Sequence, residues 1–333
     1  MKSKNRKFLV LGIVVIVAAV AGGIWYYQTQ YAQEQEMLTV STTTSLYDTG
    51  LLENAVGPAF REDTGIQCRF IPKGTGAAIK DAKMGNSDVI LVHAKSKEKA
   101  FMEEGYGVNR KVIAYNSFVI VGSPNDPAGI QGMGPAEALK KIYEEGNKGN
   151  AVWASRDDGS GTNTKEIGLW DAAGYSYEED VKGNDWFRST GQGMGATLKY
   201  SSNNDAYTLA DMGTYLAYSS EGLIDLEVLV DEGKELTNVY GVIPVNPEEY
   251  DKNFEGAMEF TKWLTSSDAQ ELIGNYGVEE FGRQLFHPAV EVLESESGDV
   301  YSWIVEYGFI NGTECPEEYR YQASEYNLDF YSD

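Results

Sequence analysis

Short apolar segments alternate with segments of helical periodicity along the first part of the chain. Strands are predicted over 38–41, 66–71 and 89–92, the last of them a continuous apolar run. Helices are predicted over 51–60 and 77–84, directly after the first two strands. This alternation is typical of parallel, doubly wound sheets, so the pattern predicts an α/β fold.

The rest of the chain continues the pattern and adds two unusual strands. Further strands are predicted over 117–122, 151–154 and 239–244, and helices over 137–145, 163–172, 207–217, 256–265 and 269–276. Two apolar segments, near 118–123 and 239–246, end in runs that contain proline, which makes them candidates for strands that cross between lobes. We therefore expect one lobe built from 37–121 plus 246–333, and a second lobe, 122–245, between them.

The amino terminus predicts a membrane anchor. Phe8 to Tyr27 is a run of 20 uncharged residues, which is long enough to cross a bilayer as one transmembrane helix. Several basic residues precede it, so residues 1–7 are expected in the cytoplasm and everything after Tyr27 outside the cell membrane. Residues 1–36 would then form a basic cytoplasmic tip, the membrane anchor and a polar spacer. The alternative is a signal peptide cleaved near 18–21, which would give a secreted or periplasmic protein.

Composition excludes several classes of function. The net charge of −24 argues against nucleic-acid binding, which needs clustered Lys and Arg. His93 and His287 are the only histidines, and neither shows metal-ligand spacing or a Ser-His pairing. We therefore expect no metal, no cofactor and no enzymatic activity.

The carboxyl-terminal segment, 289–333, differs from the rest in composition. It has eleven acidic residues, one Arg and nine aromatic residues. A purely disordered tail rarely carries so many aromatic residues, so we expect an extension packed on the first lobe.

Export would place the two cysteines, Cys68 and Cys315, in a compartment that permits disulfides. They lie far apart in the sequence, so the alternatives are one disulfide or two separate buried thiols. We predict that they pair and thereby tie the extension to the first lobe.

Three turns between a predicted strand and a predicted helix carry the candidate chemistry. They are 41–45 (STTTS), 74–76 (GTG) and 155–162 (SRDDGSGT). Backbone N–H groups at a helix start favour negative charge, glycine allows close approach, and hydroxyls add neutral donors. Each turn taken alone is better explained by helix capping. Together, with Arg156, they predict an oxyanion site formed by Thr43, Thr44, Ser45, Thr75, Gly76, Arg156, Ser160, Gly161 and Thr162.

These turns resemble those of the exported tungstate-binding proteins of ABC importers, the TupA type. The Thr-Thr-Thr-Ser, Gly-Thr-Gly and Ser-Arg-x-Asp-x-Ser-Gly-Thr motifs of that family match 42–45, 74–76 and 155–162. Further resemblances lie at 104–110, 115–122, 191–198, 206–209 and 213–216, within roughly 38–285. The resemblance implies a two-lobe type II periplasmic-binding-protein fold with a two-strand hinge. It also implies an interlobe cleft for tungstate or molybdate and an ABC transporter permease as partner. We further expect a monomer.

Other functions stay open at this point. A related loop occurs in phosphate-binding proteins, so phosphate is an alternative ligand. Hydrogen phosphate carries a proton that a buried carboxylate can accept, whereas tungstate and molybdate carry none. Asp48, Asp157 and Asp158 are therefore the residues that would discriminate the ligands. A membrane-tethered oxyanion sensor or an adhesin is a further alternative. The carboxyl-terminal extension, 289–333, is the only feature that favours it.

Overall fold

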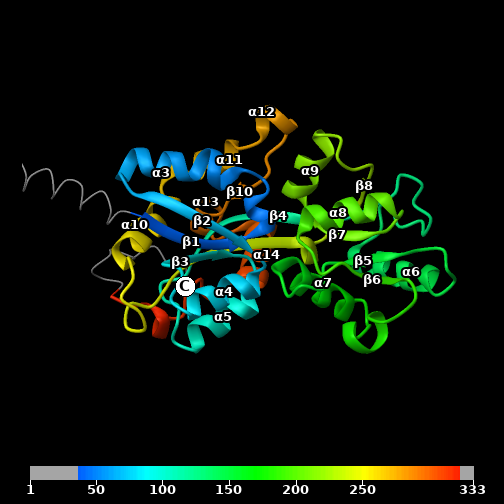
Figure 1. The fold of residues 1–333 in the computed structure, drawn as a ribbon, viewed down its shortest axis with the longest axis horizontal. Coiled ribbons are helices and arrows are strands. Elements are labelled where there is room, and N and C mark those ends of the chain that lie inside the picture. Colours follow the sequence, from blue (N-terminus) through cyan, green and yellow to red (C-terminus); the bar gives the residue numbers. More distant parts are fainter. Residues whose placement is uncertain (1–36, 323–333) are drawn as a thin grey trace, which may run out of the picture.

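The computed structural model of the protein describes residues 37–322, and Figure 1 shows them as two bodies side by side. The predicted membrane helix, Phe8 to Tyr27, lies outside the described residues. Within 37–322, no helix is both long enough and apolar enough to cross a membrane.

The main sheet lies in the first body. Its strands run in the order β10-β4-β9-β3-β1-β2. They are β1 (Met37–Thr43), β2 (Gln67–Lys73), β3 (Val89–Val92), β4 (Lys111–Gly122), β9 (Thr237–Pro244) and β10 (His287–Pro288). β1 pairs in parallel with β2 and β3, whereas β9 pairs antiparallel with β3 and β4. The expectation of parallel sheets therefore holds for β1 to β3 but not for the centre of the sheet.

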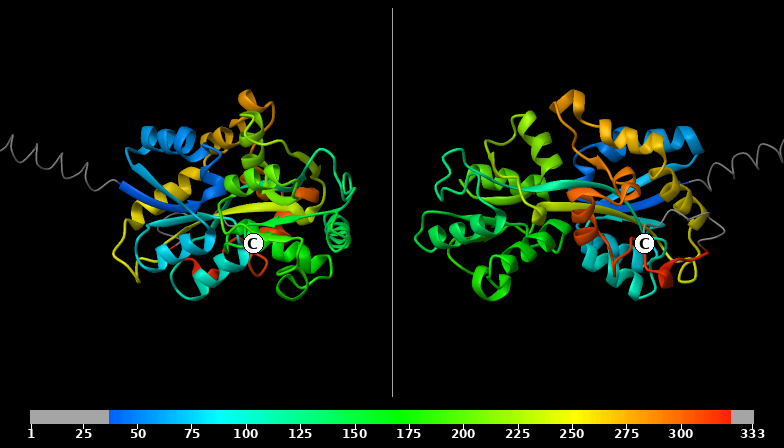
Figure 2. Two further views of the ribbon diagram at one scale, coloured as in Figure 1. Left: turned by 45° about the vertical axis from the view of Figure 1, so that its right-hand side comes forward. Right: turned by 180° about the vertical axis from the view of Figure 1, so that it is seen from behind.

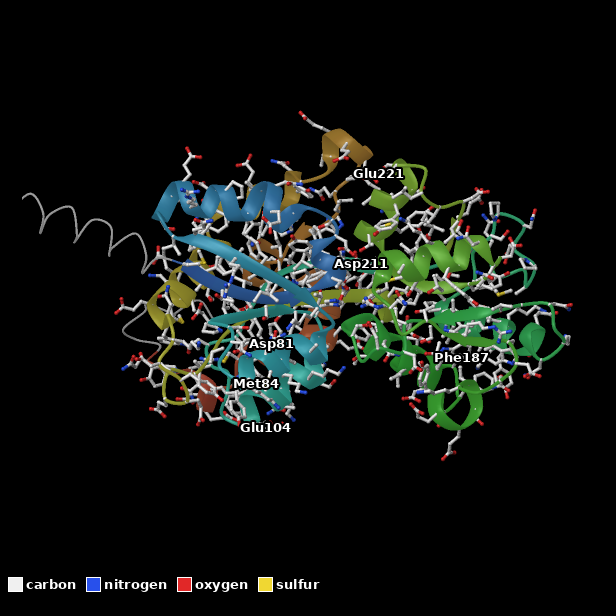
Figure 3. The ribbon with its side chains drawn as sticks, viewed as in Figure 1. Asp81, Met84, Glu104, Phe187, Asp211 and Glu221 are labelled. Atoms are coloured by element: carbon white, nitrogen blue, oxygen red, sulfur yellow. The ribbon has the colours of Figure 1, made fainter. Side chains whose placement is uncertain are left out.

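β4 continues from the first body into the second. Its first half pairs with β9, and its residues 118–122 pair with β7 (Thr208–Asp211) and β8 (Glu227–Val230). Asp211, the last residue of β7, lies at the junction of the two bodies (Figure 3). The hydrophobic cluster changes along β4 and again at the start of β9. Ile113 and Tyr240 belong to one cluster, and Phe118 and Leu236 belong to another. The chain thus passes between the clusters near 114–118 and 236–240.

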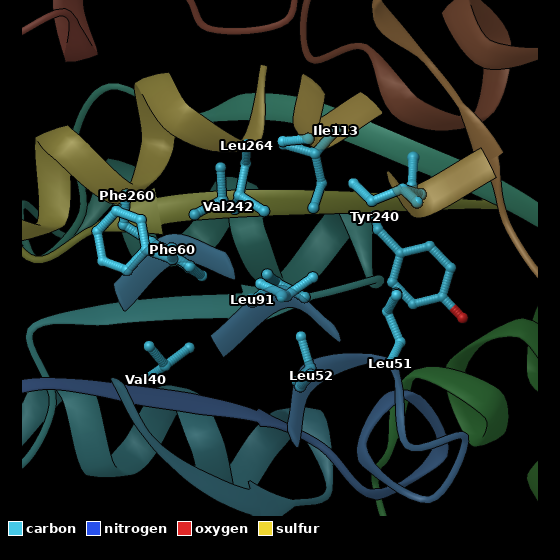
Figure 4. Packing of buried hydrophobic residues seen from close by; sticks show 14 of the residues in the cluster. Val40, Leu51, Leu52, Phe60, Leu91, Ile113, Tyr240, Val242, Phe260 and Leu264 are labelled. Carbon is cyan, nitrogen blue, oxygen red and sulfur yellow. The ribbon is translucent and has the colours of Figure 1, made fainter. Parts of the chain in front are cut away.

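Helices cover both faces of the main sheet. They are α2 (Thr44–Tyr47), the π-helix η1 (Leu52–Val56), α3 (Gly57–Thr64), α4 (Thr75–Lys83), α5 (Lys95–Glu103), α10 (Phe254–Leu264), α11 (Ser267–Asn275) and α12 (Val278–Phe281). The Phe60 and Phe260 rings meet edge to face, with centroids 5.0 Å apart, at one end of this core (Figure 4). Burial of one such ring contributes about 1.5–3 kcal/mol, so this apolar face fixes α3 and α10 on the sheet.

The second body has its own core and a small parallel sheet of β5 (Trp153–Ser155) and β6 (Phe187–Ser189). Its helices are α6 (Pro135–Gly146), α7 (Gly161–Ala172), the π-helix η2 (Tyr177–Val181), α8 (Met194–Asn203), α9 (Met212–Ser220) and the 3-10 helix η3 (Lys234–Leu236). The predicted helix over 207–217 is partly wrong, because Thr208–Asp211 is a buried strand. Asp211 then caps α9 by accepting from the Thr214 N–H at 3.2 Å.

The extension forms α13 (Val290–Ser295), α14 (Gly298–Gly308) and the 3-10 helix η4 (Glu317–Tyr319). Seen from behind, this orange and red segment lies against the first body (Figure 2). A buried ion pair joins Lys111 and Glu314 at 2.8 Å. α14 also contacts the second body, since Glu306 pairs with Lys234 at 3.0 Å.

The predicted disulfide is wrong in this structure. Cys68 lies on β2 and packs beside the core of the main sheet. Cys315 is buried in a different cluster, with Ala78, Ile79 and Phe101. The two residues are not joined, because α4 and α5 pack against Cys315 on a side of the sheet that Cys68 does not reach. Burial raises the pKa of the Cys68 thiol to about 12.

Candidate functional site

Four helix starts converge where the two bodies meet. α2 and α4 follow β1 and β2 of the first body, and α7 and α8 follow β5 and β6 of the second. A Cβ placed on Gly74, which caps α4, would lie 3.6 Å from the Ser160 Cβ at the start of α7. A Cβ on Gly193, which caps α8, would lie 3.7 Å from the Thr44 hydroxyl oxygen. Unpaired N–H groups from both bodies therefore face one small region.

Two of these helix starts are capped by a hydroxyl and two by glycine. The Thr43 hydroxyl accepts from Leu46 N–H at 3.3 Å, and the Ser160 hydroxyl accepts from Asn163 N–H at 3.1 Å. Capping is thus a real function of Thr43 and Ser160. Glycine caps α4 and α8 and brings no side chain to their first N–H groups. Those backbone donors are the ones best placed for an anion.

Arg156 lies in this region and is buried, with 2% of its surface exposed. Its Nε and Nη2 donate to one carboxylate oxygen of Asp158, at 3.1 and 2.7 Å. Nη2 also lies 3.3 Å from the Thr44 hydroxyl, across the junction, and Nη1 lies 3.4 Å from the Thr162 hydroxyl. Arg156 thus forms an ion pair with a neighbouring aspartate and also reaches across the junction to Thr44.

The three aspartates of interest lie in different surroundings. Both oxygens of Asp158 already accept hydrogen bonds, because the one that does not contact Arg156 accepts from Ser160 N–H at 3.0 Å. Asp157 has a positive φ of 43° and accepts from Lys182 at 3.0 Å. Asp48 caps the end of α2 and is exposed. Asp158 is therefore the carboxylate that is hydrogen-bonded to the guanidinium. Partial burial raises the pKa of Asp48, and the nearby Arg156 charge lowers it by a smaller amount.

Thr75 is the first residue of α4, and its hydroxyl is unpaired. Among the described residues, its oxygen is one of three buried polar side-chain atoms without a hydrogen-bond partner. Leaving such a group unsatisfied costs about 1–3 kcal/mol. A buried hydroxyl without a hydrogen-bond partner, placed at a helix start, is well suited to donate to a ligand that accepts hydrogen bonds.

The Ser45 hydroxyl meets His93, the residue that directly follows the strand predicted over 89–92. The Ser45 hydroxyl oxygen lies 3.2 Å from His93 Nε2, and both residues are buried. The His93 ring packs on the start of α7, where a Cβ on Gly161 would lie 2.6 Å from His93 Cε1. Glycine is required at 161 for this close approach. Burial lowers the pKa of His93 to about 3, so the ring is neutral.

Lys97 joins the two bodies directly. It lies on α5 of the first body and donates to the Gly159 carbonyl in the Arg156 loop of the second. Burial lowers the pKa of Lys97, while the Asp158 carboxylate raises it. A Cβ on Gly76 would lie 3.3 Å from the same Gly159 carbonyl oxygen. The two bodies are thus in contact around the helix starts.

The structure brings the predicted ligand residues into one region. They are Thr43, Thr44, Ser45, Thr75, Gly76, Arg156, Ser160, Gly161 and Thr162. Their contact with an oxyanion remains a prediction. Sequence reasoning missed Lys97, His93 and the start of α8. The glycine-rich run 191–195 was a usable signal for α8, since it repeats the pattern of 74–76 before a helix. Lys97 had no such signal, because its contact depends on how the bodies meet.

A cavity of about 270 Å³ borders the site behind His93 and Gly161. Lys165 of α7 and Tyr307 of α14 line it, with the Lys165 ammonium 4.5 Å from the centre of the Tyr307 ring. Burial lowers the pKa of Lys165 to about 8. In the described part of the chain, no group of three or more His, Cys, Asp or Glu side chains is placed to hold a metal ion.

Comparison with known proteins gives consistent results. The family description "PBP superfamily domain" matches residues 28–268. The tungstate-binding protein TupA of Peptoclostridium acidaminophilum is 41% identical over 265 residues, which cover 78% of this chain and 88% of that protein.

Two solved structures are similar in sequence and in fold. The tungstate-binding protein TupA of Desulfovibrio alaskensis G20 is 41% identical, with a TM-score of 0.63 over 76% of this chain and 98% of that chain. The tungstate ABC transporter structure from Geobacter sulfurreducens is also 41% identical, with a TM-score of 0.65 over 72% and 99%.

Proposed function

Since the chain belongs to the PBP superfamily and, within it, to the family of the TupA proteins, we propose that it is the tungstate-binding protein of an ABC importer. It captures one tetrahedral oxyanion per chain and delivers it to a membrane permease. Binding and release, without a chemical step, are its function.

One observation carries the proposal: a buried guanidinium among four helix starts from both bodies, beside an unpaired buried hydroxyl. Arg156 supplies the positive charge, Thr75 an unused donor, and α4 and α8 open backbone N–H groups. A bare dianion needs donors on all sides once it leaves water. The net charge of −24 does not attract it, so capture depends on these local dipoles and on one cation.

The proposed mechanism uses the two bodies as the lobes of a type II binding-protein fold. The predicted division, 37–121 plus 246–333 and 122–245, is kept except at its two crossing points, which we propose in β4 near 117 and in β9 near 237. Val242, Ile243 and Val245 pack in the clusters of the first lobe and Leu236 in that of the second, which supports this shift. Lys97 to Gly159 and Arg156 to Thr44 are contacts between the lobes. An oxyanion between them would strengthen closure, because each lobe donates to it.

The donor set supports tungstate or molybdate over hydrogen phosphate. Asp158, the carboxylate beside Arg156, already accepts two bonds from Arg156 and one from Ser160 N–H. It is therefore poorly placed to take the phosphate proton. A buried proton without an acceptor costs about 1–3 kcal/mol, or roughly 5- to 150-fold in affinity. Sulfate has the right charge but shorter bonds, so it should fill the site poorly.

We propose an extracytoplasmic location for the binding domain, held by the uncleaved segment Phe8 to Tyr27. The bilayer-spanning length of this run and the basic residues before it support that location. The chain acts as a monomer with one permease partner.

Calorimetric titration of the purified chain with tungstate, molybdate, sulfate and phosphate tests the proposal. We expect tungstate and molybdate to bind tightly, one anion per chain, with sulfate and phosphate well behind. Tighter binding of phosphate, or turnover of phosphate esters that a change at Arg156 abolishes, would contradict it.

A further inference from the structure

A chain of buried hydrogen bonds leads from the junction of the lobes to the oxyanion site. It starts at the fully buried carboxylate of Asp211, at the junction in Figure 3. One oxygen of Asp211 accepts from Asn116 Nδ2 at 3.0 Å, from Asn238 Nδ2 at 3.3 Å and from the Tyr240 hydroxyl at 2.7 Å. Because a carboxylate only accepts, it fixes both amides with their nitrogens toward it.

The orientation of Asn238 follows from these partners. Asn116 Nδ2 also donates to the Leu285 carbonyl at 3.3 Å, so its Oδ1 is the atom that faces Asn238. Asn238 Nδ2 donates to that oxygen at 2.9 Å. The Asn238 Oδ1 atom is left to face His93, 2.9 Å from Nδ1. His93 must therefore carry its hydrogen on Nδ1.

Because His93 is neutral, the position of its one ring hydrogen decides whether Ser45 donates to the ring or accepts from it. With the hydrogen on Nδ1, the Nε2 atom has only a lone pair. The Ser45 hydroxyl, 3.2 Å away, must donate to it. The Thr43 hydroxyl lies 3.2 Å from the Ser45 oxygen. Since the Ser45 hydrogen is already used, Thr43 donates to Ser45. The Thr43 hydrogen therefore points to the Ser45 oxygen, and the Ser45 hydrogen points to His93 Nε2.

We propose that His93 is a positioning residue of the oxyanion site, which keeps the Ser45 hydroxyl as a donor to the ring when the oxyanion binds. Ser45 then orders the turn and does not donate to the ligand, contrary to the sequence prediction. Thr43 is the hydroxyl that can turn to the oxyanion. This inference rests on the proposed oxyanion function and refines its donor set.

The asymmetry between Ser45 and Thr43 has a physical cause. If Ser45 turned to the ligand, the buried His93 Nε2 would lose its hydrogen-bond partner. The Asn238 contact prevents the ring from moving its hydrogen to that atom. If Thr43 turned, Ser45 would lose one incoming hydrogen bond but keep its bond to His93. The ring also packs on Gly161, so it cannot follow a moving hydroxyl.

Nitrogen NMR of the intact chain with ¹⁵N-labelled histidine tests the assignment. The chain has only two histidines, and a His287→Gln variant identifies the signals of His93. We expect a hydrogen on Nδ1, an Nε2 that accepts a hydrogen bond, and no change between about pH 5 and 9. The Nε2 signal should stay the same when tungstate is added. A hydrogen on Nε2, or an Nε2 that loses its hydrogen bond on addition of tungstate, would overturn the proposal.

Variants test the consequence for affinity. Ser45→Ala and His93→Asn should each weaken tungstate binding about tenfold, and the double variant should be no weaker than either, since both remove one bond. His93→Gln should stay within about threefold, because its amide oxygen can replace the Nε2 acceptor. Additive losses, about hundredfold in the double variant, would refute the coupling.

The thermal midpoint of each variant separates unfolding from a loss of binding. The spectra of the wild-type chain test the proposal even if a variant does not fold. A wild-type chain that binds phosphate but not tungstate would refute the proposed ligand. The same spectra with phosphate would then decide whether Ser45 stays on His93.

Discussion

Replacement of Arg156 by Ala is the change that should affect binding most. Arg156 is buried, and its guanidinium has contacts to Asp158, Thr44 and Thr162. Alanine removes the positive charge and leaves the Asp158 carboxylate without its ion-pair partner beside the incoming dianion. Truncation of one partner of a buried charged pair costs about 2–5 kcal/mol, which corresponds to a loss of about 30- to 5,000-fold in tungstate affinity.

Two further variants separate the causes of that loss. Arg156→Lys should recover it only in part, because an ammonium lacks the planar fork that reaches Asp158 and Thr44 together. Arg156→Ala combined with Asp158→Asn should bind better than Arg156→Ala alone, since the repelling carboxylate is gone. This second result would show that part of the loss comes from the uncompensated Asp158.

Calorimetric titration with tungstate is the assay, and Arg188→Ala is the matched control. Arg188 is exposed and donates only to carbonyls near its own strand, Asp185 and Phe187 among the described contacts. It should leave affinity unchanged. Affinity of Arg156→Ala within a few-fold of wild type would place Arg156 outside the site and refute the reasoning.

Three other changes have defined outcomes. Thr75→Val should weaken tungstate binding about 5- to 150-fold. It should leave the free energy of unfolding without ligand unchanged or about 1 kcal/mol higher, because the lost hydroxyl is buried and unpaired, and a drop in that stability would contradict the reasoning. Burial lowers the pKa of His93 to about 3. Below its ordinary pKa of about 6.5 the unfolded chain therefore binds a proton that the folded chain does not, and stability should fall by about 2 kcal/mol by about pH 5, an effect missing from acid-unfolding curves of His93→Gln. Thiol titration in denaturant without reductant should find two reactive thiols, Cys68 and Cys315, and a result of none would restore the disulfide.

Much of the first lobe could be predicted from local pattern. The strand over 89–92 is found with the same bounds, since a fully buried strand is apolar at every position. The helix starts at Gly74 and Ser160 were visible as glycine and hydroxyl residues after an apolar run. The segment over 207–217 was misjudged because a four-residue buried strand and the helix after it make one continuous apolar pattern.

The rest depends on contacts that no local pattern contains. His93 lies at the end of an apolar run, which gives no sign that its two ring nitrogens join Asn238 and Ser45. The Lys97 contact with Gly159 spans the two lobes and exists only when they meet. The cysteines were paired on the basis of compartment and number, whereas their positions in different clusters decide the matter.

The most direct measurement is a crystal structure of the tungstate complex with the anomalous signal of tungsten. The account predicts one tungsten peak per chain, among the starts of α2, α4, α7 and α8. Its oxygens should accept hydrogen bonds from Arg156 and from the Thr75 hydroxyl, and no carboxylate oxygen should touch them. A peak elsewhere, or an Asp158 oxygen in contact with the oxyanion, would contradict the account.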